Sequence, residues 1–193
     1  MLSYKESLKI LKETKALLEG HFILSSGLHS RQYVQCAQLL SKPSMASKIC
    51  ISLSEKIKDK FNKIDLILAP AMGGIIIGYE IGRLLNKETI FSERVKGSFL
   101  LRRDFVIPKN SNVLIVEDVI TTGKSSIECS KLITQSQANI LGYACIIDRS
   151  SGKSEIKGTI VSEIKLEIPT YNKNNLPEDL KLIKAIKPGS RDI

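Results

Sequence analysis

The 193-residue chain is expected to fold as an α/β protein in which helices flank a parallel sheet. Two continuous apolar runs, Asp65–Ala69 and Asn112–Val116, predict strands that are buried on both faces. Each run leads into a glycine-containing loop and then into a helical pattern. Strands that alternate with helices in this order predict right-handed crossovers in one parallel sheet. The length fits a single domain over residues 1–193.

The elements before the first buried run follow from capping and spacing. Ser3 and Glu6 match a capping box, so a helix is expected to begin there, and Gly20 is well placed to end it. Short strands are expected at His21–Leu24 and Gln32–Cys36, around a polar turn. The apolar positions at helical spacing in the first helix are Tyr4, Leu8, Leu11 and Leu18.

A second helix is expected from Pro43, because proline is favoured in the first turn. After the first buried run, the loop Pro70–Gly74 leads into a helix that reaches about Leu85. Three glycines spaced four apart lie on one face of that helix and predict close packing on the sheet. They are Gly74, Gly78 and Gly82.

The second half of the chain repeats this order. Thr89–Ser92 reads as a strand, and Ser98–Arg102 as a strand or part of a mobile loop. The second buried run is followed by a loop, a helix and two further strands. These are expected at Glu117–Gly123, Lys124–Ser136, Ile140–Ile147 and Thr159–Ile168, and the polar segment 169–193 is expected to wrap over the surface.

Composition excludes several classes of protein. The net charge is +9, but only 7 of the 29 basic residues are arginine and the lysines are dispersed, so nucleic-acid binding is not expected. The longest apolar run, Leu66–Tyr79, contains proline and glycine and is too short to span a membrane. The lysine-rich N-terminus does not predict a secretory signal, and the four cysteines lack metal-ligand spacing, which favours reduced thiols in the cytoplasm.

The stretch Val113–Ser126, VLIVEDVITTGKSS, carries the chemistry. A buried strand ends in two acids, and a loop of small residues then opens a helix, whose N-terminus favours an anion. A Walker A motif needs a glycine five residues before Gly123, where this chain has Asp118, so a nucleoside triphosphatase is excluded. Glu117 and Asp118 can accept hydrogen bonds from a vicinal diol, so a ribose 5-phosphate fits both parts of the motif.

This stretch resembles the ribose-phosphate motif of the type I phosphoribosyltransferases. The similarity extends over nearly the whole chain to the orotate-using members of that family. Four further stretches support it: His21–Arg31, Ala69–Gly78, Ser92–Phe105 and Ala185–Arg191. The first is the most discriminating, because it contains the SSG turn, whereas the acidic motif is shared by the superfamily.

The resemblance implies a core, about 41–168, beneath a small hood formed by about 1–40 and 169–193. It implies transfer of the 5-phosphoribosyl group from 5-phosphoribosyl 1-diphosphate (PRPP) to orotate, giving orotidine 5′-monophosphate and diphosphate in pyrimidine biosynthesis. It also implies Mg²⁺ carried mainly by PRPP, no dedicated metal ligands in the protein, and a cytoplasmic homodimer.

The resemblance assigns the site residues as follows. The residues expected to bind PRPP are Glu117, Asp118, Val119, Ile120, Thr121, Thr122, Gly123, Lys124 and Ser125. Those expected to bind orotate are Thr121, Arg149, Ser26 and Gly27, and a guanidinium suits the orotate carboxylate. Arg94 and Lys96 are expected to be catalytic with Asp118, in a mobile loop that also carries Arg102 and Arg103 and reaches the neighbouring subunit.

Two departures from the family pattern leave alternatives open. Met72-Gly73 stands where many orotate enzymes carry an aromatic residue and a lysine, and the mobile loop lacks the usual histidine and dense lysines. The effect of Met72-Gly73 and the identity of the catalytic cation are therefore open. The alternative functions are a phosphoribosyltransferase for another base and a regulatory protein that senses PRPP.

Overall fold

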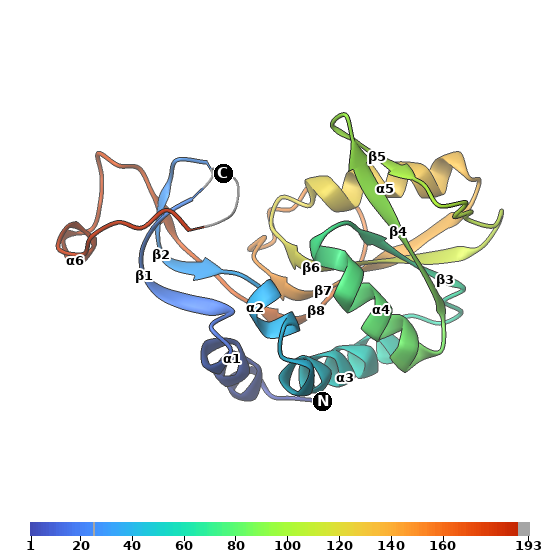
Figure 1. Cartoon of the computed structure of the whole chain (residues 1–193), viewed down its shortest axis with the longest axis horizontal. Helices are drawn as coiled ribbons and strands as arrows, with labels where there is room; N and C mark the ends of the chain where they lie inside the picture. Colours follow the sequence, from blue (N-terminus) through green and yellow to red (C-terminus); the bar gives the residue numbers. More distant parts are fainter. Residues whose placement is uncertain (25, 189–193) are drawn as a thin grey trace.

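The computed structural model describes residues 1–24 and 26–188, which form a large and a small sheet with their flanking helices (Figure 1). The large sheet contains β3 (Leu66–Pro70), β4 (Glu88–Val95), β5 (Ser98–Leu101), β6 (Asn112–Ile120), β7 (Asn139–Asp148) and β8 (Ile160–Lys165). The small sheet contains β1 (Leu17–Ile23), β2 (His29–Val34) and β9 (Thr170–Tyr171). The helices are α1 (Tyr4–Glu13), α2 (Ala37–Leu40), α3 (Pro43–Lys60), α4 (Gly73–Leu85), α5 (Lys124–Gln135) and α6 (Glu178–Lys181).

The large sheet confirms the predicted α/β class. Its strand order is β5-β4-β3-β6-β7-β8, and every neighbouring pair is parallel except β4 and β5. The order of the parallel strands reverses between β3 and β6. In open α/β sheets, ligands bind beyond the carboxyl ends of the strands at such a reversal. The topology alone therefore directs attention to the loops that follow Pro70 and Ile120.

Helices cover both faces of this sheet. α3 and α4 pack on one face, where Ile67 and Leu114 belong to one buried cluster. α5 packs on the other face, where Leu68 and Ile115 belong to a second cluster. Successive residues of β3 and β6 thus alternate between two cores, which is why both runs are apolar throughout.

The glycine face of α4 makes the close approach that its spacing predicts. A Cβ atom on Gly78 would lie 2.7 Å from the Cβ of Ala69 in β3. A Cβ atom on Gly74 would lie 2.9 Å from the carbonyl oxygen of Val116 in β6. The helix therefore sits against β3 and β6, and its first residue lies directly at the carboxyl end of the sheet.

The first helix is shorter than its apolar spacing predicts. The capping box of Ser3 and Glu6 is present, but α1 ends at Glu13, and Thr14 Oγ1 donates to the carbonyl of Ile10. Lys15 then adopts a positive φ of 61°, which turns the chain into β1. Leu18 and Gly20 therefore belong to a strand, and the prediction that Gly20 ends the helix was wrong.

The small sheet joins segments from both ends of the chain. β1 and β2 form an antiparallel hairpin, and β9 pairs with β2. The segment 183–186 lies along the free edge of β1, where Phe22 and Ile186 form a parallel bridge. Figure 1 shows this sheet to the left of the large one, with α6 at its outer end. Among the described residues, none of the helices is long and apolar enough to cross a membrane.

Candidate active site

The two acids of the central motif lie inside a strand rather than in a loop. The apolar pattern predicts that the strand ends at Val116, but β6 continues to Ile120. Its backbone pairs with β7 through Glu117, opposite Cys145, and through Ile120, opposite Asp148. The extra length arises from this pairing with β7, a tertiary contact that the local pattern does not contain.

Glu117 is held in a buried position. Its side chain accepts a hydrogen bond from Ser126 Oγ at 2.7 Å, and the residue is 9% exposed. Burial, opposed by the Ser126 hydrogen bond and assisted by the neighbouring Asp118, raises the pKa of Glu117 to about 7. A carboxyl group with a pKa near 7 can hold or release a proton at neutral pH.

Asp118 faces the opposite loop across the reversal of strand order. A Cβ atom on Gly73 would lie 2.7 Å from Asp118 Oδ1, so the start of α4 rests against this carboxylate. The backbone N–H of Val119 donates to the same oxygen at 2.9 Å, whereas burial raises the pKa of Asp118. The Met72-Gly73 pair, whose effect the sequence leaves open, therefore lies beside Asp118, and the peptide bond between Ala71 and Met72 is cis.

The loop after β6 presents small polar groups at the start of α5. Thr121 and Thr122 are exposed, and the Lys124 N–H donates to Thr122 Oγ1 at 3.3 Å. Gly123 is the N-cap of α5 and has a positive φ of 81°. A Cβ atom there would lie 2.5 Å from a side-chain carbon of Ile156, so glycine is required on two grounds. The backbone N–H groups of the first helical turn complete a site that favours an anion.

Arg149 follows β7 on the neighbouring strand. Its backbone N–H donates to the carbonyl of Ile120 at 2.8 Å, which places it beside Thr121. Its Nε atom is buried and has no hydrogen-bond partner among the described residues. Burial lowers the pKa of Arg149, although Cys36 and Tyr33 oppose the shift. A guanidinium in this setting gains stability from an anionic ligand.

The side chains of Val119 and Ile120 differ from the rest of the predicted PRPP set. Ile120 is 1% exposed and belongs to the core on the α5 side, and Val119 packs against the core on the other side. Ser125 is partly buried. Val119 and Ile120 therefore offer a ligand their backbone atoms rather than their side chains.

The predicted mobile loop forms a hairpin of β4 and β5, which Figure 1 shows projecting above the large sheet. Arg94 Nη2 donates to Glu128 Oε2 of α5 at 2.5 Å, and its guanidinium carbon lies 4.2 Å from the centre of the Phe99 ring. Lys96 is exposed at the two-residue turn, where it and Gly97 both have positive φ. Arg102 and Arg103 both contact Glu93.

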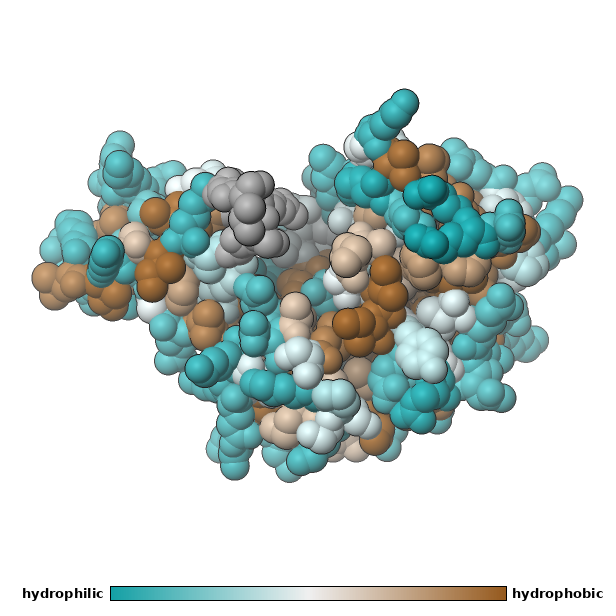
Figure 2. Space-filling view, in the orientation of Figure 1, coloured by the Kyte–Doolittle hydropathy of each residue, from teal (hydrophilic) through white to brown (hydrophobic). Residues whose placement is uncertain are grey.

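The turn between β1 and β2 carries the other two residues expected at orotate. Ser26 and Gly27 are exposed, and the Leu28 N–H lies 3.4 Å from Ser26 Oγ. Ser25 lies outside the described residues, as do residues 189–191 of the C-terminal stretch that supports the family resemblance. Figure 2 shows a notch between the lobe of the small sheet and the lobe of the large sheet.

Three contributors to the site lie outside the predicted set. Ser126 binds Glu117, Ile156 closes over Gly123, and the Glu155 N–H donates to the Thr122 carbonyl at 3.1 Å. Ser126 lies in the motif, but its spacing from Glu117 has meaning only once the strand, loop and helix are folded. Residues 155 and 156 come from a segment after β7 that carries no recognisable pattern.

The described residues contain no cluster of metal ligands. Across residues 1–24 and 26–188, no group of three or more histidine, cysteine, aspartate or glutamate side chains gathers in a way that could hold a metal ion. The four cysteines are free and buried. Near the site, the adjacent carboxylates of Glu117 and Asp118 offer oxygen ligands for a hard cation.

Comparison with known proteins places this site in a family. The family model described as the phosphoribosyl transferase domain matches residues 36–181. An orotate phosphoribosyltransferase of Methylobacterium sp. (strain 4-46) is 46% identical over 177 residues, which cover 91% of this chain and 90% of the relative. The chain belongs to the orotate phosphoribosyltransferase family. The orotate phosphoribosyltransferase of Methylorubrum populi is 45% identical over 188 residues, or 97% of this chain and 96% of the relative.

A solved structure agrees with membership in the orotate phosphoribosyltransferase family. The crystal structure of orotate phosphoribosyltransferase from Aeropyrum pernix superimposes with a TM-score of 0.72 at 26% identity. The match covers 82% of this chain and 93% of that chain. The expected α/β phosphoribosyltransferase fold and the expected family are both confirmed.

Proposed function

We propose that the chain transfers the 5-phosphoribosyl group from PRPP to orotate, giving orotidine 5′-monophosphate and diphosphate in pyrimidine biosynthesis. The observation that carries the proposal is the Nε atom of Arg149, which is buried without a hydrogen-bond partner among the described residues and lies beside a loop suited to phosphate. A cation suits the orotate carboxylate, and the loop suits the phosphate of the donor. The curated relatives named for this activity support the same conclusion.

The donor lies along β6 and the start of α5 in this proposal. The loop Thr121–Ser125 holds the 5-phosphate, and the carboxylates of Glu117 and Asp118 accept hydrogen bonds from the ribose hydroxyls. Val119 and Ile120 contribute backbone atoms. The diphosphate extends toward the loop before α4, because Gly73 of that helix lies against Asp118. A larger side chain at position 73 would collide with the Asp118 carboxylate. Backbone N–H groups of that loop, rather than a lysine, bind the diphosphate there.

The acceptor lies between the large sheet and the hood. Arg149 binds the orotate carboxylate through a charge-assisted pair, and Thr121 contacts the ring. Ser26 and Gly27 are contributed by the turn of the small sheet, whose lobe is separated from that of the large sheet by a notch (Figure 2). The acceptor therefore touches residues of both sheets, whereas the donor needs only the large one.

Chemistry at this site is a substitution at the anomeric carbon. The bond from that carbon to diphosphate breaks with oxocarbenium character, a ring nitrogen of orotate forms the new bond, and its proton passes to solvent. Asp118 stabilises the positive charge that develops on the ribose. Lys96 and Arg94 stabilise the negative charge on the departing diphosphate. Arg94 must first leave Glu128, whereas Lys96 is already exposed.

Magnesium is compatible with this donor set. Glu117 and Asp118 would offer it carboxylate oxygens, and a cation carried mainly by PRPP would need few ligands from the protein. When bound, it neutralises part of the diphosphate charge.

The proposed assembly is a cytoplasmic homodimer in which the hairpin of one subunit closes over the site of the other. The hairpin extends beyond Ser92, the last β4 residue paired with β3, so its cations are carried away from the subunit's own sheet. Closure would exclude water, which would otherwise hydrolyse the activated ribose. The four free thiols fit a reducing compartment.

The proposal is tested with purified protein, PRPP and Mg²⁺, with orotate, uracil and hypoxanthine as parallel acceptors. Loss of orotate and appearance of orotidine 5′-monophosphate, with no product from the other bases, is the expected result. Turnover of another base instead of orotate would overturn the assignment of the acceptor. Protection of the protein by PRPP against thermal unfolding without any turnover would point to a regulatory protein.

A further inference from the structure

Two buried histidines form a hydrogen-bonded pair in the small sheet. His21 Nε2 and His29 Nδ1 lie 2.6 Å apart, and His21 Nδ1 lies 2.8 Å from the carbonyl oxygen of Ile183. The two residues are 4% and 6% exposed. These are the only histidines in the chain, and the proposed reaction uses neither.

The partners of the pair determine where its protons lie. A carbonyl oxygen only accepts, so His21 Nδ1 carries a hydrogen that it donates to Ile183. In the neutral pair His21 Nε2 is therefore bare and accepts from His29 Nδ1–H. One extra proton can be held with both hydrogen bonds intact. A second extra proton places N–H groups on both facing nitrogens at 2.6 Å, and the contact must then open.

The pair ties the C-terminal segment to the base of the turn that carries Ser26 and Gly27. Ile23 and His29 are paired residues at the base of that turn. The Ile23 N–H donates to the Ile186 carbonyl at 2.8 Å, and the Ile186 N–H donates to the His21 carbonyl at 2.9 Å. Both sides of the turn are thus held through His21.

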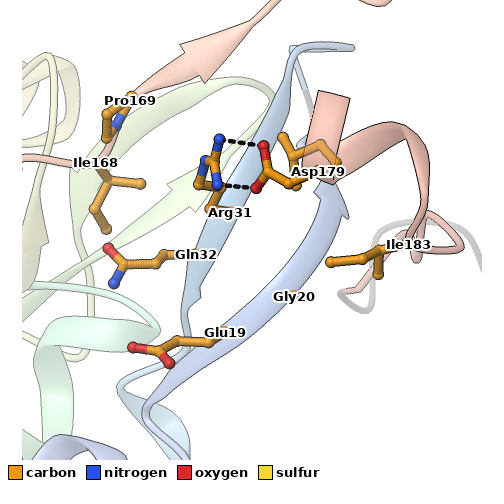
Figure 3. Close-up of a pocket in the computed structure, with 9 residues that line it drawn as sticks. Glu19, Gly20, Arg31, Gln32, Ile168, Pro169, Asp179 and Ile183 are labelled. Atoms are coloured by element: carbon orange, nitrogen blue, oxygen red, sulfur yellow. Dashed lines mark hydrogen bonds and ion pairs between the residues drawn. The ribbon is translucent and has the colours of Figure 1, made fainter. Parts of the chain in front are cut away.

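The same C-terminal segment is fastened at a second point. Figure 3 shows Arg31 of β2 paired with Asp179 of α6, and Ile183 near Gly20 of β1. A cavity of about 450 Å³ lies between the segment and the sheet. The segment is therefore held at two points, the Arg31–Asp179 ion pair and the histidine pair, and histidine is the side-chain type whose ordinary pKa lies closest to neutral pH.

We propose that His21 and His29 are positioning residues that hold the turn of Ser26 and Gly27 in its orotate-binding position, and that protonation of both histidines releases it. The inference rests on the proposed function, because it assigns this turn to the acceptor. The pair lies in the small sheet and the proposed donor site in the large one, so the effect falls on orotate rather than on PRPP.

The charges around the pair set the direction of the pH effect. Burial lowers the pKa of His29, and the neighbouring His21 and Lys173 lower it further. The Ile183 carbonyl is the acceptor that the segment offers, and Tyr171 of β9 lies opposite His29. The pair therefore binds a proton less readily while it holds the turn than after release, when a histidine has an ordinary pKa of about 6.5. Attachment of the C-terminal segment to the turn is unaffected well above that pH and weakens as the pH falls below it.

The test compares the wild type with His29→Asn and Arg31→Gln at pH 7.5 and pH 5.5. In the wild type, the dissociation constant of orotate, measured by calorimetry with PRPP absent, is expected to rise between roughly twofold and tenfold per pH unit below pH 6.5, the limit for one linked proton. Asparagine can donate or accept at the position of Nδ1, so His29→Asn is expected to lose this rise while binding orotate normally at pH 7.5. Arg31→Gln removes the ion pair with Asp179 and is expected to weaken orotate binding equally at both pH values.

Hydrogen exchange of residues 183–188, corrected for the intrinsic pH dependence, gives a readout that needs no activity. Protection of this segment is expected to fall at pH 5.5 in the wild type but not in His29→Asn. Unchanged protection in the wild type would overturn the role of the histidine pair. A loss of protection without weaker orotate binding would overturn its link to the acceptor. A protein that binds no orotate at any pH, yet shows the exchange change, would contradict the proposed function and leave the pH-dependent release intact.

Discussion

Arg149 has a buried nitrogen atom that lacks a hydrogen-bond partner in the protein without a ligand, among the described residues. Its backbone is fixed by the carbonyl of Ile120, but its Nε atom is buried with no hydrogen-bond partner among the described residues. Removing a charge from water without a partner costs free energy, which a bound carboxylate returns. In the proposed complex, Arg149 would therefore be more favourably placed with orotate bound than in the free protein.

Arg149→Gln is expected to separate stability from binding. Loss of a charge-assisted pair costs about 3 kcal/mol, so the KM for orotate should rise roughly 100-fold while the KM for PRPP stays within about threefold. The thermal midpoint of the free protein should stay equal or rise, because an unpaired charge is removed. Arg83→Gln, at an exposed arginine on α4, is the matched control. An equal rise in both KM values would show that Arg149 does not act on the acceptor.

At the scale of elements, the contact of α4 with β3 positions the two halves of the donor site. The Cα of Gly78 faces the methyl group of Ala69, and the first residue of the helix, Gly73, lies against Asp118. A shift of α4 away from the sheet would therefore also move the loop that is proposed to bind diphosphate. The packing of one helix thus sets the distance between the two loops that are proposed to bind the donor.

Gly78→Ala is expected to destabilise the protein by about 2 kcal/mol and to raise the KM for PRPP more than that for orotate, because the added methyl group overpacks the contact with Ala69. The free energy of unfolding in urea and steady-state kinetics measure the two effects. Ala69→Gly in the same chain removes the opposing methyl group and should restore most of both. Failure of this second change to restore either quantity would contradict the packing account.

At the scale of the whole molecule, the hairpin of β4 and β5 carries Lys96, at its tip, away from the sheet that holds the acids. Arg94 is paired with Glu128 of the same chain, and Lys96 lies exposed at the tip. Exchange of hairpins between two subunits would bring such cations to a neighbour's diphosphate without any large change within either subunit. The proposed dimer is therefore part of the catalytic arrangement.

Mixing two inactive variants tests this exchange. A chain with Arg94→Gln and Lys96→Gln lacks the hairpin cations, and a chain with Asp118→Asn lacks the ribose carboxylate. After the two are unfolded and refolded together, about a quarter of the sites should be intact, since half of the dimers are mixed and each holds one complete site. Steady-state rates should recover to roughly that fraction of the wild type. No recovery in demonstrably mixed dimers would place the hairpin over its own site.

Features that depend only on residues close together in the sequence could be predicted from the sequence alone. The capping box at Ser3, the apolar runs of β3 and β6 and the glycine face of α4 follow from local spacing, and the structure contains all of them. The acids and the loop after them are contiguous, so the motif at Glu117–Ser125 could be read as a phosphate site, and its family could be recognised, before the fold was known.

Contacts between groups that are far apart in the sequence depend on the tertiary structure. The strand order brings Gly73 to Asp118, the pairing with β7 carries β6 as far as Ile120, and the burial that leaves the Nε of Arg149 without a partner depends on segments far apart in the chain. The contact of His21 with His29 and with the C-terminal segment is of the same kind. Local patterns report which face of an element is apolar, but the partner that covers that face is chosen by packing of the whole chain.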